Sequence, residues 1–393
     1  MISAALLALV RCPACRGPLA PDRGPGAGAG VAPDAASDDA PRLHAFRCRN
    51  CDARYPQTSG DYLDLRPRTA FAEQTKYLDE ALHQDARHES VSPPLLQSGV
   101  RQRQLRRFLR FAPGDRVVDL GCGSGRSILW NAASGASFTG VDVSPFFAQE
   151  ARATADLALA DLRQLPFADG AFTKAYALDV LEHLSPEALD AMLAEAARVL
   201  APGGALFVYS HVRKNAPIAK GLRAINALAR GLERVGLIDM TQERLRKSDH
   251  LNPLHDVPHL EAVVDRAGFR IDRIRYYTPL VGGFVENILM RMAERALARR
   301  ADRRRAALAQ SHALNSAQSA AQSQLPSQEA APSTSDQSQS AGLRDARLSA
   351  KARLARGGPL VRVLQGVTVM MDADLWLFGR IRSGPFFARL EKR

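Results

Sequence analysis

The chain has 393 residues, of which 46% are hydrophobic and 24% charged, so its length allows two or three domains and its composition excludes a wholly disordered protein. A formal net charge of +12 favours an anionic partner, either nucleic acid or a lipid surface. No apolar run approaches the ~18 residues that a membrane-spanning helix needs. The apolar residues 2–10 lack the basic start and cleavage site of a signal peptide. We therefore expect a cytoplasmic protein.

Four of the five cysteines form two pairs near the start of the chain. Cys12 and Cys15 make one CxxC pair, and Cys48 and Cys51 make the second. Each CxxC turn offers two thiolates, and two such turns complete a tetrahedral zinc site. Because all four ligands would be cysteines and no position stays open, the pattern predicts a structural Zn²⁺ site and not a catalytic one. The alternatives are two redox-active CxxC pairs or four unrelated thiols.

A run rich in Gly, Ala, Pro and Asp separates the two pairs. This run spans residues 21–41, and its composition predicts a flexible loop that a small module can tolerate, because loop-closure entropy grows slowly with length. We therefore expect a zinc ribbon over residues 1–66, followed by a helical lead-in over residues 67–110.

Short apolar strands alternate with helical segments between residues 111 and 278. Predicted strands cover residues 117–120, 137–142, 172–178, 205–209 and 268–277, and a further short strand is expected to end at residues 159–161. A helix is expected to begin near Arg126, and the apolar periodicity of residues 186–200 predicts another. Such alternation predicts an α/β fold with a parallel, doubly wound sheet. The strand Val117–Leu120 is followed by Gly-Cys-Gly-Ser-Gly, a turn in which glycines let the backbone approach a ligand closely.

Five motifs in this order resemble those of the class I S-adenosylmethionine-dependent methyltransferases. They read VVDLGCGSGR, GVDVS, ADLRQLPF, ALDVLEHL and RVLAPGGALFVYS. The resemblance implies a Rossmann-like sheet of seven strands with the last strand antiparallel, and S-adenosyl-L-methionine as the cofactor. It implies that Asp142 binds the ribose, that Asp161 and Leu162 bind the adenine, and that Asp179 lies beside the reactive centre. It assigns the methionine part of the cofactor to Asp119, Gly121, Cys122 and Gly123.

The sequence offers candidates for a general base without requiring one. A base is needed only where the acceptor carries a proton that has to leave. Asp179, Glu182 and His183 follow the fourth strand and are the candidates, with His183 and Asp179 taken as the candidate catalytic residues. The alternative is that Glu182 and His183 begin the next helix and order the local turn. Three further histidines, His250, His255 and His259, have poor spacing for a metal site.

The remaining segments are basic additions to an acidic core. Residues 111–210 carry 6 basic and 12 acidic side chains, whereas residues 279–393 carry 18 basic and 9 acidic ones. Residues 384–393 resemble the closing strand of the family, which makes residues 279–383 an insertion before that strand. Within this insertion, residues 309–341 are rich in Ser, Gln and Ala and are expected to be disordered. A second insertion at residues 211–258 is expected to form a cap near the acceptor.

Three hypotheses for the acceptor stay open. The first is a small-molecule or lipid-linked acceptor, with peripheral contact at the inner membrane surface through residues 285–305 and 343–382. The second is an RNA base, because the cysteine module resembles the ribbons of ribosomal-RNA guanine methyltransferases and of the zinc-ribbon partners of tRNA methyltransferases. The third is a non-catalytic scaffold or zinc-ribbon adaptor of the same fold.

Overall fold

The structure is a computed structural model. It describes residues 2–22, 45–56, 61–67, 90–213, 219–240, 250–296 and 351–393, together with positions 299, 300, 303, 310 and 349. The expected loop over residues 21–41 and the expected linker over residues 309–341 therefore lie almost wholly outside the described residues. The exceptions are Pro21 and Asp22, which end a strand, and the helical position 310.

The described chain contains two sheets and two layers of helices. The helices are α1 (Ala4–Leu9), α3 (Leu96–Leu109), α4 (Arg126–Asn131), η3 (Ala132–Ser134), α5 (Gln149–Thr154), η4 (Leu181–His183), α6 (Pro186–Val199), α7 (Ala219–Arg234), α9 (Val257–Arg266), α10 (Leu280–Phe284), η5 (Val285–Met290), α13 (Pro359–Met371) and α14 (Ala373–Phe378). The strands are β1 (Leu19–Asp22), β2 (Ala45–Cys48), β3 (Arg54–Pro56), β4 (Leu63–Asp64), β5 (Arg116–Leu120), β6 (Ser137–Asp142), β7 (Asp156–Leu159), β8 (Phe172–Leu178), β9 (Leu200–His211), β10 (Phe269–Tyr276) and β11 (Pro385–Lys392).

The large sheet has the strand order β10-β11-β9-β8-β5-β6-β7-β4. Strands β4 to β9 of this sheet pair in parallel, and β11 runs antiparallel to both of its neighbours, β9 and β10. The predicted Rossmann-like fold with an antiparallel last strand is thus confirmed. The sheet has eight strands and not the predicted seven, because Leu63 and Asp64 add a short strand beside β7. Two residues are too few to leave a period in the sequence.

Alternating side chains divide the core into two halves. In β9, Leu206 and Val208 pack on one face of the sheet with α6 and α9, while Phe207 and Tyr209 pack on the other with α3. Successive side chains of a strand point to opposite faces, so a strand that is buried on both faces is apolar throughout. Seven consecutive residues of β9 are buried, from Gly204 to Ser210, and all but Ser210, whose hydroxyl is hydrogen-bonded, follow this rule.

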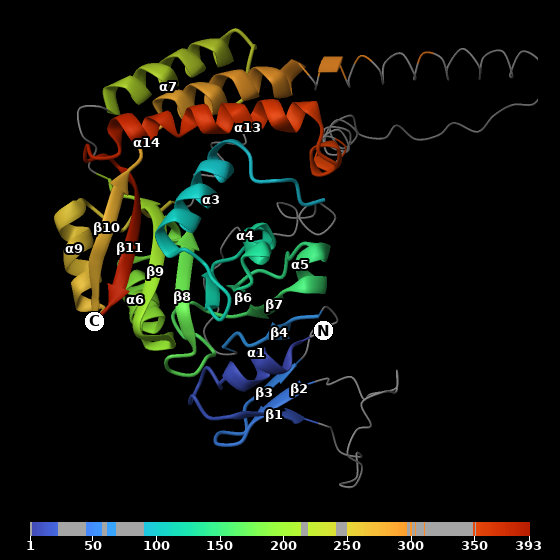
Figure 1. The fold of residues 1–393 in the computed structure, drawn as a ribbon, viewed down its shortest axis with the longest axis vertical. Helices are drawn as coiled ribbons and strands as arrows, with labels where there is room; N and C mark the ends of the chain where they lie inside the picture. The colour runs from blue at the N-terminus through green and yellow to red at the C-terminus, as the bar shows by residue number, and fades with distance from the viewer. Residues whose placement is uncertain are drawn as a thin grey trace, which may run out of the picture.

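The cysteine module is docked firmly on the large sheet (Figure 1). The backbone N–H and the hydroxyl of Ser3 both donate to the Asp156 carboxylate, at 3.1 and 2.6 Å. Further along, the Arg11 N–H donates to the Pro166 carbonyl at 2.8 Å. Leu6 of α1 is 1% exposed and belongs to the same core cluster as the sheet. Buried contacts of this kind make the module part of one folded unit.

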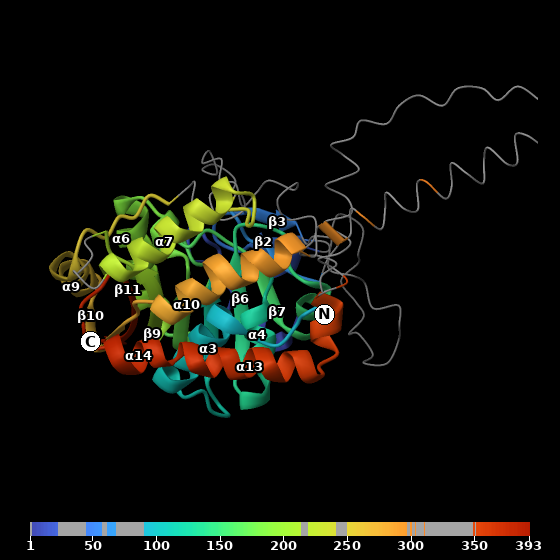
Figure 2. The same cartoon turned by 90° about the horizontal axis from the view of Figure 1, so that it is seen from above.

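The helices between β10 and β11 form a lid together with α7. Figure 2 shows α7, α10 and α13 lying across the end of the sheet at which its parallel strands finish. The lid is fastened to α3, since the Leu96 N–H donates to the Thr368 hydroxyl at 2.7 Å and Arg103 pairs with Asp372 at 2.8 Å.

A buried carboxylate joins two helices of the lid. Asp374 is fully buried and accepts hydrogen bonds from the N–H groups of Val281 and Gly282, at 3.0 and 2.9 Å. These donors belong to the first turn of α10, which is where a helix lacks internal acceptors and favours a negative charge. None of the helices in the described ranges is long and apolar enough to cross a membrane.

The carboxylate of Asp115 holds the turn that precedes β5. This carboxylate accepts from the Lys174 ammonium at 2.5 Å, the Ala112 N–H at 2.8 Å and the Thr173 hydroxyl at 3.1 Å. Burial would raise the pKa of Asp115, but these donors lower it below the ordinary value. Asp115→Asn should reduce the free energy of unfolding by about 1–3 kcal/mol at pH 7, measured by chemical denaturation.

A lowered folded-state pKa stabilises the fold above the unfolded pKa of about 3.9. The deficit of Asp115→Asn should therefore shrink as the pH falls below about 4. Asp190→Asn is the control, because Asp190 pairs with Arg266 on the surface and its loss should cost at most about 0.5 kcal/mol. Equal deficits for the two variants would contradict the role of Asp115.

Candidate active site

The candidate site begins where β5 ends in a glycine turn. Gly121, Gly123 and Gly125 have φ values of 78°, 54° and 78°, which lie in the left-handed region that favours glycine. The N–H groups of Gly121 and Cys122 both donate to the Val141 carbonyl of β6 at 2.9 Å. The turn is thereby held against the end of the neighbouring parallel strand, and α4 begins directly after it at Arg126.

The space around two of these glycines differs. A Cβ atom at Gly121 would come within 2.6 Å of Val180, so this position has to be glycine for packing as well as for φ. A Cβ atom at Gly123 would meet no protein atom within 4 Å. The backbone at Gly123 therefore faces open space at the end of the sheet, where ligands of open α/β sheets bind.

Asp142 ends β6 and lies beside the glycine turn. Its carboxylate accepts from the Gly123 N–H at 2.7 Å, from the Ser144 N–H at 2.9 Å and from the Ser144 hydroxyl at 2.7 Å. It is 9% exposed. Three donors fix this carboxylate at the edge of the space that Gly123 faces.

Asp119 is a buried acid below the same turn. It is 2% exposed, and its Oδ2 atom has no hydrogen-bond partner among the described residues. Burial raises the pKa of Asp119 well above its ordinary value; interaction with the Tyr176 hydroxyl opposes the rise, and the charge of Asp142 adds to it. Burial likewise raises the pKa of Cys122, whose thiol is therefore an unreactive packing group.

Asp161 follows β7 and forms a local ion pair. Both of its carboxylate oxygens accept from the Arg163 guanidinium, at distances of 2.8–3.0 Å, and Oδ1 also accepts from the Arg163 N–H at 2.9 Å. Asp161 is 6% exposed, and the half-buried Leu162 packs against the core. Residues 161–163 thus form a fixed turn at the same edge of the sheet as Asp142.

Asp179 follows β8 in a strained backbone conformation. Its φ of 57° is one of six positive values at non-glycine residues of the described chain. Its carboxylate pairs with Arg101 of α3 at 2.5 Å, and the Arg101 guanidinium lies 4.7 Å above the Tyr209 ring. Burial would lower the pKa of Arg101, but the charges of Asp179, Tyr209 and Glu286 together raise it. A left-handed residue costs about 1–2 kcal/mol and persists where its surroundings hold it.

Glu182 and His183 lie in the short helix η4 and do not begin the next long helix. Ser185 caps α6, which begins at Pro186, so the alternative that they start that helix is wrong. Glu182 is 3% exposed and accepts from the Ser210 hydroxyl at 2.9 Å. Burial, with the charge of Asp179, raises the pKa of Glu182 to about 7.

His250, His255 and His259 lie at two different places in the structure. The rings of His255 and His259 stack at 4.9 Å, whereas His250 lies 4.7 Å from the His183 ring, edge to face. The spacing of residues in the sequence did not reveal that His250 approaches Glu182 and His183, since His250 lies 67 positions after His183. It also missed Arg101 and Ser210, for which no motif gave a signal.

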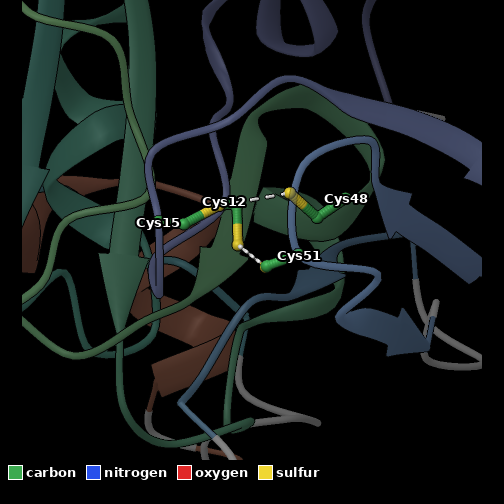
Figure 3. Close-up of side chains that lie close together, drawn as sticks. All are labelled: Cys12, Cys15, Cys48 and Cys51. Carbon is green, nitrogen blue, oxygen red and sulfur yellow. Dashed lines mark hydrogen bonds between the residues drawn. The ribbon is translucent and has the colours of Figure 1, made fainter.

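The four predicted zinc ligands come together (Figure 3). The sulfur atoms of Cys12 and Cys51 are 3.6 Å apart and those of Cys15 and Cys48 are 3.4 Å apart, and all four lie within 4.8 Å of one another. Burial would raise the pKa of Cys48, yet the N–H groups of Cys51 and Asn50 lower it to about 7. The side chains converge on one point, so the four thiols can hold a metal ion.

The two cysteine turns have matching backbones. Arg16 and Asp52, the residues that follow the second cysteine of each pair, have φ values of 59° and 57°. Their N–H groups donate back to the carbonyls of Cys12 and Cys48, at 2.7 and 3.2 Å. The repeated geometry aims two thiols from each turn at a common point.

The comparisons with known proteins agree with this geometry. Residues 117–204 match a family described as a methyltransferase domain. Methyltransferase GfsG of Streptomyces halstedii is 32% identical over 166 residues, which cover 38% of this chain and 56% of that protein. The 27-O-demethylrifamycin SV methyltransferase of Amycolatopsis mediterranei is 30% identical over 155 residues, which cover 36% of this chain and 56% of that protein. The chain thus spans about half the length of these relatives.

Among solved structures, phosphoethanolamine N-methyltransferase 2 of Haemonchus contortus, in complex with S-adenosyl-L-methionine, aligns with 82% of this chain and 59% of its own. The identity is 17% and the TM-score is 0.42. The matched family model, the strand order and the glycine turn lead to one conclusion. Residues 117–204 form a methyltransferase domain within the Rossmann-like sheet.

Proposed function

We propose that the chain binds S-adenosyl-L-methionine at the end of β5 and transfers its methyl group to a small-molecule acceptor under the lid. The observation that carries the proposal is the open space at Gly123, bordered by the fixed carboxylate of Asp142. The buried, unpartnered Oδ2 atom of Asp119 supports it, because buried polar atoms are normally satisfied and this one lies below the same turn.

The residues present fit the parts of the cofactor. Asp142 would accept from the two ribose hydroxyls, while Asp161 and Leu162 would bind the adenine. The methionine part would lie against the turn at the end of β5, made of Asp119, Gly121, Cys122 and Gly123. The ion pair with Arg163 already fixes the orientation of the Asp161 carboxylate, which favours this role.

When bound, the cofactor supplies a methyl group that its sulfonium charge has already activated. The remaining tasks of the chain are to align an acceptor atom and to exclude water. Asp179 and Arg101 form a rigid charged pair at the end of β8, next to β5 in the sheet. We infer that this pair forms one wall of the acceptor site, with His183 and Glu182 on the same side.

The exposed face of the lid favours contact with a hydrophobic partner. This face exposes large apolar side chains on α13 and α14, including Val363, Val369 and Trp376, which is 85% exposed. An exposed apolar face of this size is typical of a surface that meets a hydrophobic partner. The printed name of the Amycolatopsis mediterranei relative, a demethylrifamycin methyltransferase, also favours a small organic acceptor. A more specific version of this proposal is that the acceptor is a lipid-linked molecule taken from a membrane surface.

We also propose that the four cysteines hold one structural Zn²⁺ ion. Thiolates in such close contact repel one another unless a cation lies between them, and a site of four cysteines leaves no position open for substrate.

The first test concerns the cofactor pocket. Gly123→Ala should weaken S-adenosylmethionine binding at least about tenfold in calorimetry, because the added methyl group enters the open space. Asp142→Ala should do the same through loss of its ribose contacts. Gly114→Ala is the matched control, since Gly114 also has a positive φ and open space but lies before β5. Equal affinities for Gly123→Ala and Gly114→Ala would contradict the pocket.

The second test identifies the acceptor class. The purified chain is incubated with a cell extract and methyl-labelled S-adenosylmethionine, and the extract is then separated into lipid, small polar and RNA fractions. We expect label in the lipid or small-molecule fraction and none with Asp142→Ala. Label in RNA would favour the base methyltransferase hypothesis, and absence of both label and cofactor binding would favour the scaffold hypothesis.

The third test concerns the ribbon. Cys48→Ser should lower the zinc content below one ion per chain and lower the melting temperature of the whole chain, because the ribbon packs into the main core. Cys122→Ser should keep its zinc, since Cys122 lies outside the cluster. Elemental analysis and calorimetry measure both effects, and full zinc content in Cys48→Ser would exclude the site.

A further inference from the structure

A second group of metal-ligating side chains lies at the end of β8. Glu182, His183 and His250 each offer one ligand atom, and these atoms all lie within 4.8 Å of one another. Metal bonds of about 2.0–2.2 Å place ligand atoms at most roughly 4.4 Å apart, so a small adjustment of the side chains is enough. Two imidazoles and one carboxylate suit a divalent first-row metal ion and leave coordination positions open.

The backbone brings His250 to the other two residues. The N–H groups of Leu251 and Asn252 both donate to the Glu182 carbonyl, at 2.8 and 2.9 Å. On the far side, the Arg213 guanidinium donates to the Leu251 and Asn252 carbonyls, at 2.7 and 2.5 Å. The segment that follows His250 is thereby fastened to both η4 and the end of β9, so the three ligands are held before any ion arrives.

The groups around Glu182, His183 and His250 also favour a bound cation. The Ser210 hydroxyl, itself 1% exposed, holds one oxygen of the buried Glu182 carboxylate, as outer partners do in metal sites. A buried carboxylate is costly unless a positive charge compensates it. Arg101 lies against Asp179, with which it forms an ion pair at 2.5 Å, and a cation among Glu182, His183 and His250 would balance the second acid.

We propose that Glu182, His183 and His250 bind a divalent first-row metal ion that holds an oxygen acceptor for methylation. The acceptor would bind the ion through the hydroxyl oxygen that is methylated. A cation lowers the pKa of the hydroxyl it binds, so the proton leaves to solvent without a separate base. The oxygen then bonds to the methyl carbon, the carbon–sulfur bond breaks with its electron pair on sulfur, and an ether and a neutral thioether result. This acceptor role rests on the proposed function, whereas the metal site does not.

The site is tested with Co²⁺ alone, titrated into the full-length chain after its cysteine site has been filled with zinc. Calorimetry should show one Co²⁺ ion per chain, with visible absorption that lacks the charge-transfer bands of thiolate ligands. His250→Ala and Glu182→Gln should each weaken binding at least about tenfold, and Ser210→Ala about 10-fold. His255→Ala is the control, because His255 is exposed and stacks on His259 outside the cluster.

Measuring S-adenosylmethionine binding distinguishes a failure of the metal site from a failure of its acceptor role or of the proposed function. His250→Ala should keep its affinity for S-adenosylmethionine, which also shows that it folds, and should lose label transfer to the extract. If His250→Ala fails to fold, His183→Ala takes its place. Absence of Co²⁺ binding by the wild-type chain, or equal binding by His250→Ala, would overturn the metal site. Co²⁺ binding with unimpaired label transfer in His250→Ala would overturn its acceptor role, and loss of cofactor binding in the wild-type chain would overturn the proposed function alone.

Discussion

The parallel pairing of β5 with β6 and β8 is the constraint on which the site depends. Asp119 pairs in register with Gly140 of β6 and with Tyr176 of β8. Because these three strands point the same way, the residues that follow them meet at one edge of the sheet. A slip of one residue in either pairing would move the side chains of a strand to the opposite faces of the sheet and shift its terminal acid away from that edge. The packing of the sheet core therefore fixes the positions of the acids at the strand ends, although these acids are not part of that core.

Two additions to this sheet are held by buried polar groups. Glu195 of α6 accepts from the Leu165 N–H at 2.8 Å and from Arg198 and Arg16, so one carboxylate joins α6, the turn after β7 and the cysteine module. Asp374 plays the same part inside the lid by capping α10. Charged groups buried with full sets of partners specify one arrangement of elements, where apolar contacts alone would tolerate several.

The sequence predicted the parts of the fold that rest on local patterns. Apolar runs such as Val117–Leu120 and Phe172–Leu178 marked strands, and the glycine turn with Asp142 marked the ligand edge, because both signals lie within a few neighbouring residues. The short strand β4 carried too few residues to show a period. The contacts of Arg101 with Asp179 and of His250 with His183 join distant segments, and no single sequence records such a pairing.

The two clusters of ligating side chains differ in a way that assigns them different tasks. The four cysteines come from two rigid turns with matching backbones, and they would enclose an ion completely. Glu182, His183 and His250 provide three ligand atoms close to the strained residue Asp179, which follows β8. Structural metal sites are closed, and sites that act on substrates keep a position open. Strain at Asp179 persists because Arg101 holds its side chain and the Tyr209 carbonyl holds its N–H at 3.1 Å, so the fold maintains a costly backbone conformation beside the open cluster.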